Sequence, residues 1–153
     1  MFFHKPGRFE AGAYSENKQA KQALTAEGKA HGTIVYCGKD PVGWCQFGPR
    51  EELPRIDRKR GYKPTSSEPW RITCLFIAPR HRKSGLAKFA VRESIGAMRK
   101  LKADVVEAYP VDGTKSASLL WMGTPHLFEG EGFHRAGPLG KGSWVYSLNL
   151  KKP

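Results

Sequence analysis

Short apolar runs alternate with polar segments along the whole chain. Runs bounded by turn-forming residues predict strands at 32–37, 42–47, 72–77, 103–111, 133–137 and 143–150. Longer segments of helical composition or period predict helices at 15–30, 84–101 and 125–131. This order predicts the fold class α/β or α+β, with a right-handed strand–helix–strand crossover around 84–102.

The N-terminal part has a weaker pattern. Met1–Lys5 is expected to form a short edge strand, and a chain that starts inside a strand suggests a clipped or variant N-terminus. The helix at 15–30 contains few apolar residues, so we expect it to lie on a surface.

The central helix from Ser84 is amphipathic. Its apolar residues fall on one broad side at about 100° per residue, and they are Ala87, Ala90, Val91, Ile95, Met98 and Leu101. The cations Lys88, Arg92 and Arg99 gather on the other side. The apolar side is therefore expected to cover a sheet.

Residues 48–69 contain four prolines and ten charged residues, which predicts that most of the segment is a long loop, with the start of a short helical turn at Glu51–Leu53 left open. Loops of this length in compact domains are usually functional or mobile. A lid on the substrate side and a plain basic insertion are both left open.

Composition narrows the class of protein. The chain has 153 residues, which suits one domain over 1–153, and 39% hydrophobic with 26% charged residues is typical of a globular protein. No apolar segment approaches the ~20 residues of a membrane span. Three cysteines, Cys37, Cys45 and Cys74, lie in apolar runs and are spaced unlike any zinc site. Buried free thiols, a cytoplasmic location and no metal site are therefore expected.

The formal net charge is +12. This charge is compatible with a nucleic-acid surface, an acidic substrate or solubility alone, and it does not distinguish between the three.

A basic turn, Arg80–Gly85, separates the apolar run at 72–77 from the central helix. Unpaired N–H groups and the helix dipole make such a helix start favourable for an anion, and glycine permits a close approach. Cations are unfavourable beside this positive end, so the pattern predicts a bound anion such as a phosphate.

The turn also resembles a known motif. Residues 82–87 fit the Q/R-x-x-G-x-G/A pyrophosphate motif of the GNAT acetyltransferases, and 127–133 resemble their L-Y-E-x-x-G-F segment. Four further elements resemble a poorly characterised bacterial branch of this superfamily, at 42–45, 48–50, 109–112 and 123–124. The resemblance implies a mixed, mostly antiparallel twisted sheet flanked by helices, with a strand–turn–helix unit at 70–101.

The resemblance implies acetyl-CoA as the cofactor. The backbone N–H groups of the turn would hold the pyrophosphate, and these belong to Arg82, Lys83, Ser84, Gly85, Leu86 and Ala87. Phe76 and Ile77 would offer backbone groups to the pantetheine arm. Their strand and the one near Val105–Tyr109 would splay apart to form a slot for the coenzyme.

Two positions depart from the family pattern. The tyrosine that protonates the leaving thiolate in many members is Phe128 here, and the strand glutamate used as a base would fall at Arg71. Glu107, Tyr109 and His126 are candidates to carry the proton, with Glu107 and Tyr109 on one face of their strand. Trp44, Trp70 and Trp121 line an acceptor pocket or the core.

These observations predict an N-acetyltransferase that passes acetyl from acetyl-CoA directly to an amine. The acceptor is a small molecule or a peptide amine, a homodimer is left open, and neither a membrane nor nucleic acid is expected as a partner. A GNAT fold that binds a coenzyme or a protein without catalysis is the main alternative, and a basic nucleic-acid-binding domain is the other.

Overall fold

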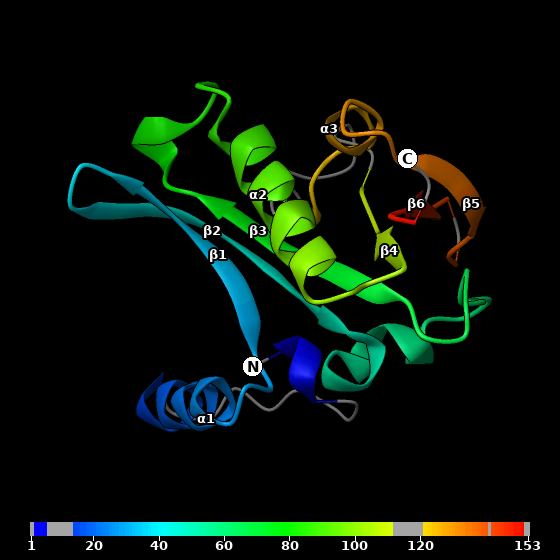
Figure 1. The fold of residues 1–153 in the computed structure, drawn as a ribbon, viewed down its shortest axis with the longest axis horizontal. Helices are drawn as coiled ribbons and strands as arrows, with labels where there is room; N and C mark the ends of the chain where they lie inside the picture. The colour runs from blue at the N-terminus through cyan, green and yellow to red at the C-terminus, as the bar shows by residue number, and fades with distance from the viewer. Residues whose placement is uncertain (1, 6–13, 112–120, 141, 152–153) are drawn as a thin grey trace.

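The computed structural model describes residues 2–5, 14–111, 121–140 and 142–151. One six-stranded sheet has the order β1-β2-β3-β4-β6-β5 (Figure 1). Its strands are β1 (His31–Cys37), β2 (Asp40–Pro49), β3 (Trp70–Ile77), β4 (Val105–Ala108), β5 (His134–Pro138) and β6 (Trp144–Asn149). The α-helices are α1 (Tyr14–Ala26), α2 (Leu86–Lys100) and α3 (Pro125–Glu129). Four 3-10 turns are η1 (Phe2–His4), η2 (Arg50–Glu52), η3 (Pro54–Arg58) and η4 (Pro79–His81).

Four of the five strand pairings are antiparallel, and only β3–β4 is parallel. A parallel pair needs a crossover, and α2 supplies it between β3 and β4. The predicted fold class and the strand–helix–strand unit are therefore confirmed.

The β3–β4 seam is short. The two strands pair only through Trp70, Arg71 and Ile72, which lie opposite Val106, Glu107 and Ala108. β3 then continues to Ile77 without a paired β4 residue, and we call the region between the two strands beyond Ile72 the slot. Thr73 stands where the slot begins, in an irregularity of β3 at which Phe47 pairs with Ile72 and Gln46 with Cys74.

The first core lies between α2 and the sheet. Ala90, Val91, Ile95 and Met98 are buried there, as the periodicity predicts. Leu101 differs, because it caps the helix end and is 48% exposed.

A second core lies on the opposite face of the sheet. It contains Phe3, Leu53, Ile56, Tyr109, Met122, Leu139 and Val145. Leu53 and Ile56 come from the segment predicted as a long loop, and both are fully buried. A loop is the wrong prediction at 48–49, where β2 ends, and at 54–58, where η3 lies, while η2 falls near the short helical turn left open at Glu51–Leu53.

The N-terminal segment is a 3-10 turn and not the predicted strand. Phe3 is buried in the second core and packs against Trp121, with ring centroids 5.4 Å apart. In an edge strand the consecutive side chains of Phe2 and Phe3 would point to opposite faces of the sheet. A turn allows both to pack on the same side. α1 has no buried residue, as expected for a surface helix, although it ends at Ala26.

Smaller differences concern the C-terminal half and the cysteines. β4 is shorter than the predicted 103–111 strand, and α3 ends at Glu129 rather than at 131. Cys45 is buried, Cys74 is half-buried and Cys37 is exposed, so the expectation of three buried thiols holds only in part. Burial raises the pKa of the Cys45 thiol to about 12, which keeps it protonated.

Candidate active site

The turn before α2 has a strained backbone. Lys83 has a φ of 61° and Gly85 a φ of 82°, both in the left-handed region. Glycine adopts this region freely, whereas lysine does so at a cost of about 1 kcal/mol or more. Lys102 has a φ of 64°, but it follows the end of α2, where a left-handed residue is a common cap. Lys83 has no such explanation, and strain of this kind is concentrated at functional sites.

The start of α2 is open for an anion. Gly85 occupies the N-cap position, no side chain accepts a hydrogen bond from the first turn, and that turn contains no acidic residue. The first N–H groups of a helix lack intrahelical partners, and the dipole adds positive potential. Arg82 and Lys83, both exposed, place further positive charge here. A pyrophosphate therefore fits these residues.

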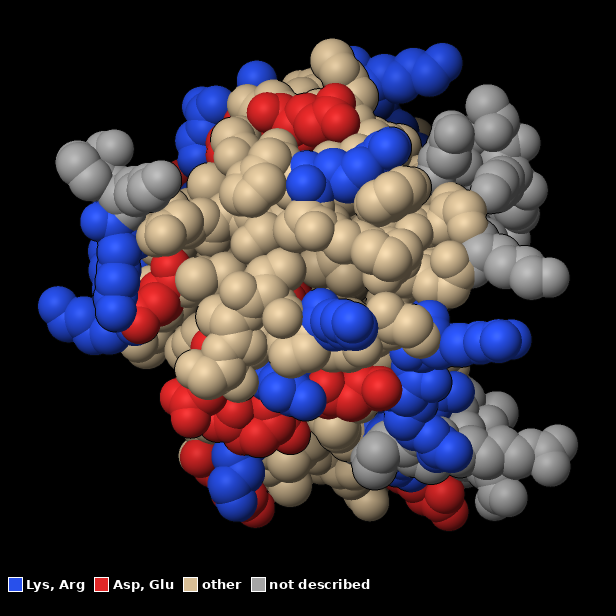
Figure 2. Space-filling model, turned by 90° about the vertical axis from the view of Figure 1, so that its right-hand side faces the viewer, with Lys and Arg blue, Asp and Glu red and all other residues tan. Residues whose placement is uncertain are grey.

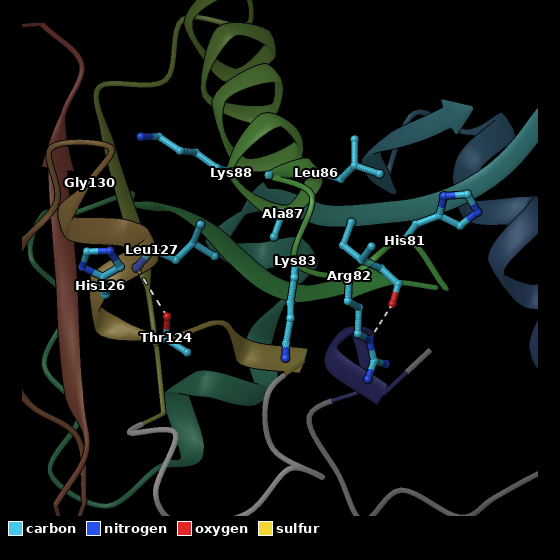
Figure 3. A pocket seen from close by; sticks show the side chains of 12 residues that line it. His81, Arg82, Lys83, Leu86, Ala87, Lys88, Thr124, His126, Leu127 and Gly130 are labelled. Atoms are coloured by element: carbon cyan, nitrogen blue, oxygen red, sulfur yellow. Dashed lines mark hydrogen bonds between the residues drawn. The ribbon is translucent and has the colours of Figure 1, made fainter. Parts of the chain in front are cut away.

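A pocket of about 380 Å³ lies between the start of α2 and α3 (Figure 3). Its lining is Ile77, His81, Arg82, Lys83, Gly85, Leu86, Ala87, Lys88, Thr124, His126, Leu127 and Gly130. Six of the eight residues predicted to bind the cofactor are among them. Phe76 and Ser84 are not, and the Ser84 hydroxyl instead donates to the carbonyl of His81, which closes the turn.

Sequence reasoning named His126 as a candidate proton carrier but missed the rest of the α3 side of this pocket. Thr124 caps α3 by accepting a hydrogen bond from the N–H of Leu127, and this cap brings His126 and Leu127 to the pocket (Figure 3). The cap itself was predictable, but the packing of α3 beside α2 is tertiary. Lys88 could have been found, because it lies one turn beyond Gly85 on the same helix.

The alternation of β3 decides which backbone groups face the slot. The N–H of Ala78 donates to the carbonyl of Val42 at 2.8 Å, so this pair is hydrogen-bonded. In an antiparallel pair the backbone groups of every second residue point toward the partner strand. Phe76 therefore points its groups toward β2, and Leu75 and Ile77 point theirs toward the slot.

The backbone of Ile77 faces the slot, as the predicted cofactor contact requires. Its carbonyl, however, already accepts a hydrogen bond from Arg82 Nε at 3.0 Å (Figure 3). This bond fixes the Arg82 side chain beside the turn. The predicted contact with Phe76 stays a prediction, and the alternation favours Leu75 in its place.

A second polar cluster lies on the other face, around Glu107. Its carboxylate is fully buried and accepts four hydrogen bonds, from the hydroxyls of Tyr62 and Tyr109 at 2.6 Å each and from the N–H and hydroxyl of Thr65 at 2.6 and 2.8 Å. These bonds tie residues 62–65 to β4. The acceptor sites of the carboxylate are filled, so a role as a proton acceptor stays a prediction that this geometry does not favour.

Arg71 is the cation of the same cluster. Its guanidinium is fully buried and donates two hydrogen bonds to Asp57, at 2.9 and 3.1 Å, and one to Tyr62 at 2.9 Å. Burial works to lower the pKa of Arg71, but the Asp57 carboxylate raises it overall. Burial works to raise the pKa of Asp57, and Arg71 lowers it overall. The position that holds a base in some relatives thus holds the anchor of the η3 turn.

The tyrosines of this cluster stay protonated. Burial raises the pKa of Tyr109 well above its ordinary value, although the charge of Arg71 works to lower it, and Glu107 adds to the rise. Burial and the bond to Glu107 raise the pKa of Tyr62 to about 12. Tyr109 is 2% exposed, and its part in proton transfer remains a prediction.

Phe128 is fully buried and packs edge-on against Phe133, with centroids 5.2 Å apart. A side chain on Gly123 would meet the Phe128 ring at 2.7 Å, so this corner is filled. Phe128 contributes packing and no proton. Trp121 packs in the second core and Trp70 against the first, while Trp44 lies under Lys21, whose ammonium is 5.4 Å from the ring centroid.

Charges of both signs are mixed on the face shown in Figure 2, where acidic side chains gather low on the surface among lysines and arginines. This face has no continuous basic patch of the kind expected for a nucleic-acid surface. Within the described parts of the chain, no group of three metal-ligating side chains is present. No helix among the described residues is long and apolar enough to cross a membrane.

The sheet, the turn and the pocket form a fold that suits binding of an anionic coenzyme, and comparison with known proteins gives the family. The profile described as "Acetyltransferase (GNAT) family" matches residues 3–119, and the chain therefore belongs to this family. No curated protein matches the sequence.

Solved structures share the fold at low sequence identity. A protein of the GNAT family from Desulfovibrio desulfuricans has a TM-score of 0.61 and 16% identity, over 94% of this chain and 84% of that one. A ribosomal-protein-alanine N-acetyltransferase from Brucella melitensis has a TM-score of 0.60 and 15% identity, over 92% and 81%. The yncA protein of Salmonella typhimurium, solved with acetyl-CoA, has a TM-score of 0.60 and 14% identity, over 94% and 78%. The prediction of acetyl-CoA as the cofactor is confirmed at the level of the family.

Proposed function

We propose that this protein is an N-acetyltransferase that binds acetyl-CoA first and passes acetyl directly to an amine. The observation that carries the proposal is the uncapped, cationic start of α2, which opens onto a pocket and a slot. The turn would hold the pyrophosphate through backbone N–H groups and Arg82, and the free edge of β3 would hold the pantetheine arm. Acetyl-CoA supplies an activated thioester, so the protein needs mainly to position the amine.

The positive charge around the turn would serve the coenzyme, because Arg82, Lys83 and Lys88 line the pocket where the anionic pyrophosphate is expected. The acceptor amine would attack the thioester at the far end of the pantetheine arm. Glu107, Tyr109 and His126 stay candidates for carrying the proton away, and of these His126 lines the pocket.

Calorimetric titration with acetyl-CoA and with coenzyme A tests the first half of this proposal. We expect binding at micromolar concentrations, and the absence of binding in this range would sink the proposal. An amine panel assayed by free-thiol release tests the second half, with polyamines, aminoglycosides, amino acids and peptide N-termini as acceptors. The peptide arm is motivated by the structural neighbour named for a ribosomal-protein alanine.

A second candidate is a GNAT fold that binds the coenzyme without catalysis. Phe128 and Arg71 favour it, because each stands where relatives hold a group that moves a proton. Tight coenzyme binding combined with no thiol release across the whole panel would support this candidate. Thiol release by the wild type with any acceptor of the panel would contradict this candidate and support the transferase.

A further inference from the structure

Three features meet at Thr73. It is the first residue of β3 beyond the β4 pairing, where the slot begins. It is also the extra residue of the β3 irregularity, because its neighbours Ile72 and Cys74 pair with the consecutive residues Phe47 and Gln46. Bulges of this kind often lie beside active sites and redirect a side chain.

The third feature is an unsatisfied hydroxyl. Thr73 is 1% exposed, and its Oγ1 has no hydrogen-bond partner among the described residues. A buried polar group without a partner is costly, and native proteins keep few of them. Valine has nearly the same shape and would fill the site without that cost. The described residues supply no partner for this hydroxyl, and a ligand that enters the slot would supply one.

The position of Thr73 relative to the pocket indicates which partner. From Ile77, which lines the pocket, to Thr73 the strand spans about 13 Å, at roughly 3.3 Å per residue. An extended pantetheine arm has a similar length. If the pyrophosphate lies at the turn and the arm follows β3, the thioester reaches the closed end of the slot, beside Thr73. This step rests on the proposed function.

We propose that the Thr73 hydroxyl donates a hydrogen bond to the carbonyl oxygen of the bound acyl thioester. The bond orients the carbonyl toward the amine and withdraws electron density from its carbon. Thr73 forms no covalent bond and keeps its proton throughout. Because the hydroxyl is sealed in the coenzyme-free chain, the slot widens as the acyl group enters.

The neighbouring orphan atom is less informative. Arg71 Nε is also buried without a partner, but the rest of that guanidinium is bonded to Asp57 and Tyr62 on the opposite face. Arg71 keeps its other hydrogen bonds, so one unpaired nitrogen on this fixed side chain does not indicate a ligand. Thr73 has a single polar side-chain atom, and that atom is unpaired at the end of the slot.

The experiment compares Thr73→Val and Thr73→Ser with the wild type. Titration calorimetry gives the affinity for acetyl-CoA and for coenzyme A, which lacks the carbonyl. We expect Thr73→Val to weaken acetyl-CoA binding about 5- to 10-fold, the usual range for one lost hydrogen bond, and to leave coenzyme A binding unchanged. Thr73→Ser keeps the hydroxyl and should keep most of the affinity for acetyl-CoA.

Two further readouts do not depend on turnover. The infrared band of acetyl-CoA labelled with 13C at the carbonyl should lie at lower frequency in the wild type and Thr73→Ser than in Thr73→Val. Thermal unfolding without ligand should give Thr73→Val a Tm equal to or above that of the wild type, because an unsatisfied group has been removed. Thr33→Val is the matched control, since Thr33 lies on β1 and accepts from Ser94 rather than facing the slot.

Equal loss of both ligands in Thr73→Val, or an unchanged ratio and an unshifted carbonyl band, overturns the proposal and leaves the proposed function standing. Coenzyme binding by no variant, the wild type included, overturns both. A marked loss of stability in Thr73→Val also contradicts it, because the hydroxyl would then have a partner within the protein.

Discussion

Two polar regions lie at opposite ends of the slot between β3 and β4, and they differ in how fully their groups are paired. Glu107 and Arg71 are fully buried, and nearly every donor and acceptor around them has a partner within the chain. At the start of α2 the groups are exposed cations and uncapped N–H groups, with a strained Lys83 between them. Both regions are charged, but the second has far more bonding capacity left for a ligand.

This difference is a better guide to function than charge or burial alone. A saturated network such as that of Glu107 fixes structure, because altering any member leaves another unpaired. An unsaturated site such as the α2 start is tolerated only where something else completes it. Variants that alter one region should therefore change ligand affinity, and variants in the other should change the free energy of unfolding.

The largest effect is expected from Gly85→Glu. The new carboxylate would lie at the anion site, and the left-handed backbone adds strain. We expect coenzyme A affinity to fall by about 100-fold or more, since like charges placed together at a binding site cost several kcal/mol. Titration calorimetry measures the loss. Gly61→Glu is the matched control, because Gly61 has a φ of 77° and open space around it but lies outside the pocket.

Glu107→Gln should affect stability and not binding. An amide cannot accept all four hydrogen bonds, so donors of Tyr62, Tyr109 or Thr65 lose their acceptor, and the Tyr109 hydroxyl among them is buried. We expect a loss of about 2–3 kcal/mol in the free energy of unfolding, measured with denaturant. Glu129→Gln should reduce the free energy of unfolding much less. The Glu129 carboxylate accepts a hydrogen bond from the Tyr146 hydroxyl, and an amide oxygen can accept it equally well.

The same variant tests the predicted catalytic role of Glu107. If turnover per folded molecule falls far more than coenzyme affinity, Glu107 is a proton carrier and the contrast between the two regions is wrong. Unchanged turnover assigns Glu107 to structure.

An intermediate effect on the free energy of unfolding is expected from acid, through His4 in the η1 turn. Burial, then Lys21, lowers the pKa of His4 to about 4, against 6.5 for a free side chain. The folded state thus holds His4 neutral, and its contribution to stability is full above pH 6.5 and is lost as the pH falls toward 4. His4→Gln should flatten the wild-type loss over this window, measured by denaturation at several pH values.

Two comparisons keep the His4 prediction specific. Burial raises the pKa of Glu52, which acts in the opposite sense, so the difference between wild type and His4→Gln is the quantity to read. His134→Gln, at an exposed position on β5, should leave the slope unchanged. An identical slope in wild type and His4→Gln would contradict the prediction.

The smallest effect is expected from Lys88→Gln. Lys88 lines the pocket and is exposed, so we expect a 2- to 3-fold weaker coenzyme A affinity, roughly 0.5 kcal/mol, that disappears at high salt. Arg92→Gln is the control, because Arg92 lies one turn further along α2, contacts the same Glu131, and lies outside the pocket. Equal weakening by both variants would indicate a general effect of net charge.

The sequence predicts those parts of the molecule that depend on neighbours in the chain. The apolar stripe of α2, the cap at Thr124 and the glycine turn all follow from residues within a few positions of one another. The partners of Glu107 could not be predicted, because Tyr62 and Thr65 precede it by 45 and 42 residues. The irregularity at Thr73 was missed for a similar reason, since it is visible only once the β2 register is known.

Residues 50–58 show the same limit of sequence-based prediction. Their charges and prolines predict a loop, yet Leu53 and Ile56 are buried in the second core and Asp57 accepts a hydrogen bond from Arg71. The local sequence pattern does not predict the bond from Asp57 to Arg71, because Arg71 lies on a strand 14 residues away.

The three-pair seam has a consequence for the order of folding. β1 and β2 are joined by a two-residue turn, and β5 and β6 are also consecutive, so these two hairpins can form from local pairs. The seam instead requires closure of the α2 crossover, and such non-local contacts form slowly because loop closure costs entropy. We expect the two hairpins to assemble early and the seam later. Variants at Ile72 or Ala108 should therefore speed unfolding more than they slow folding.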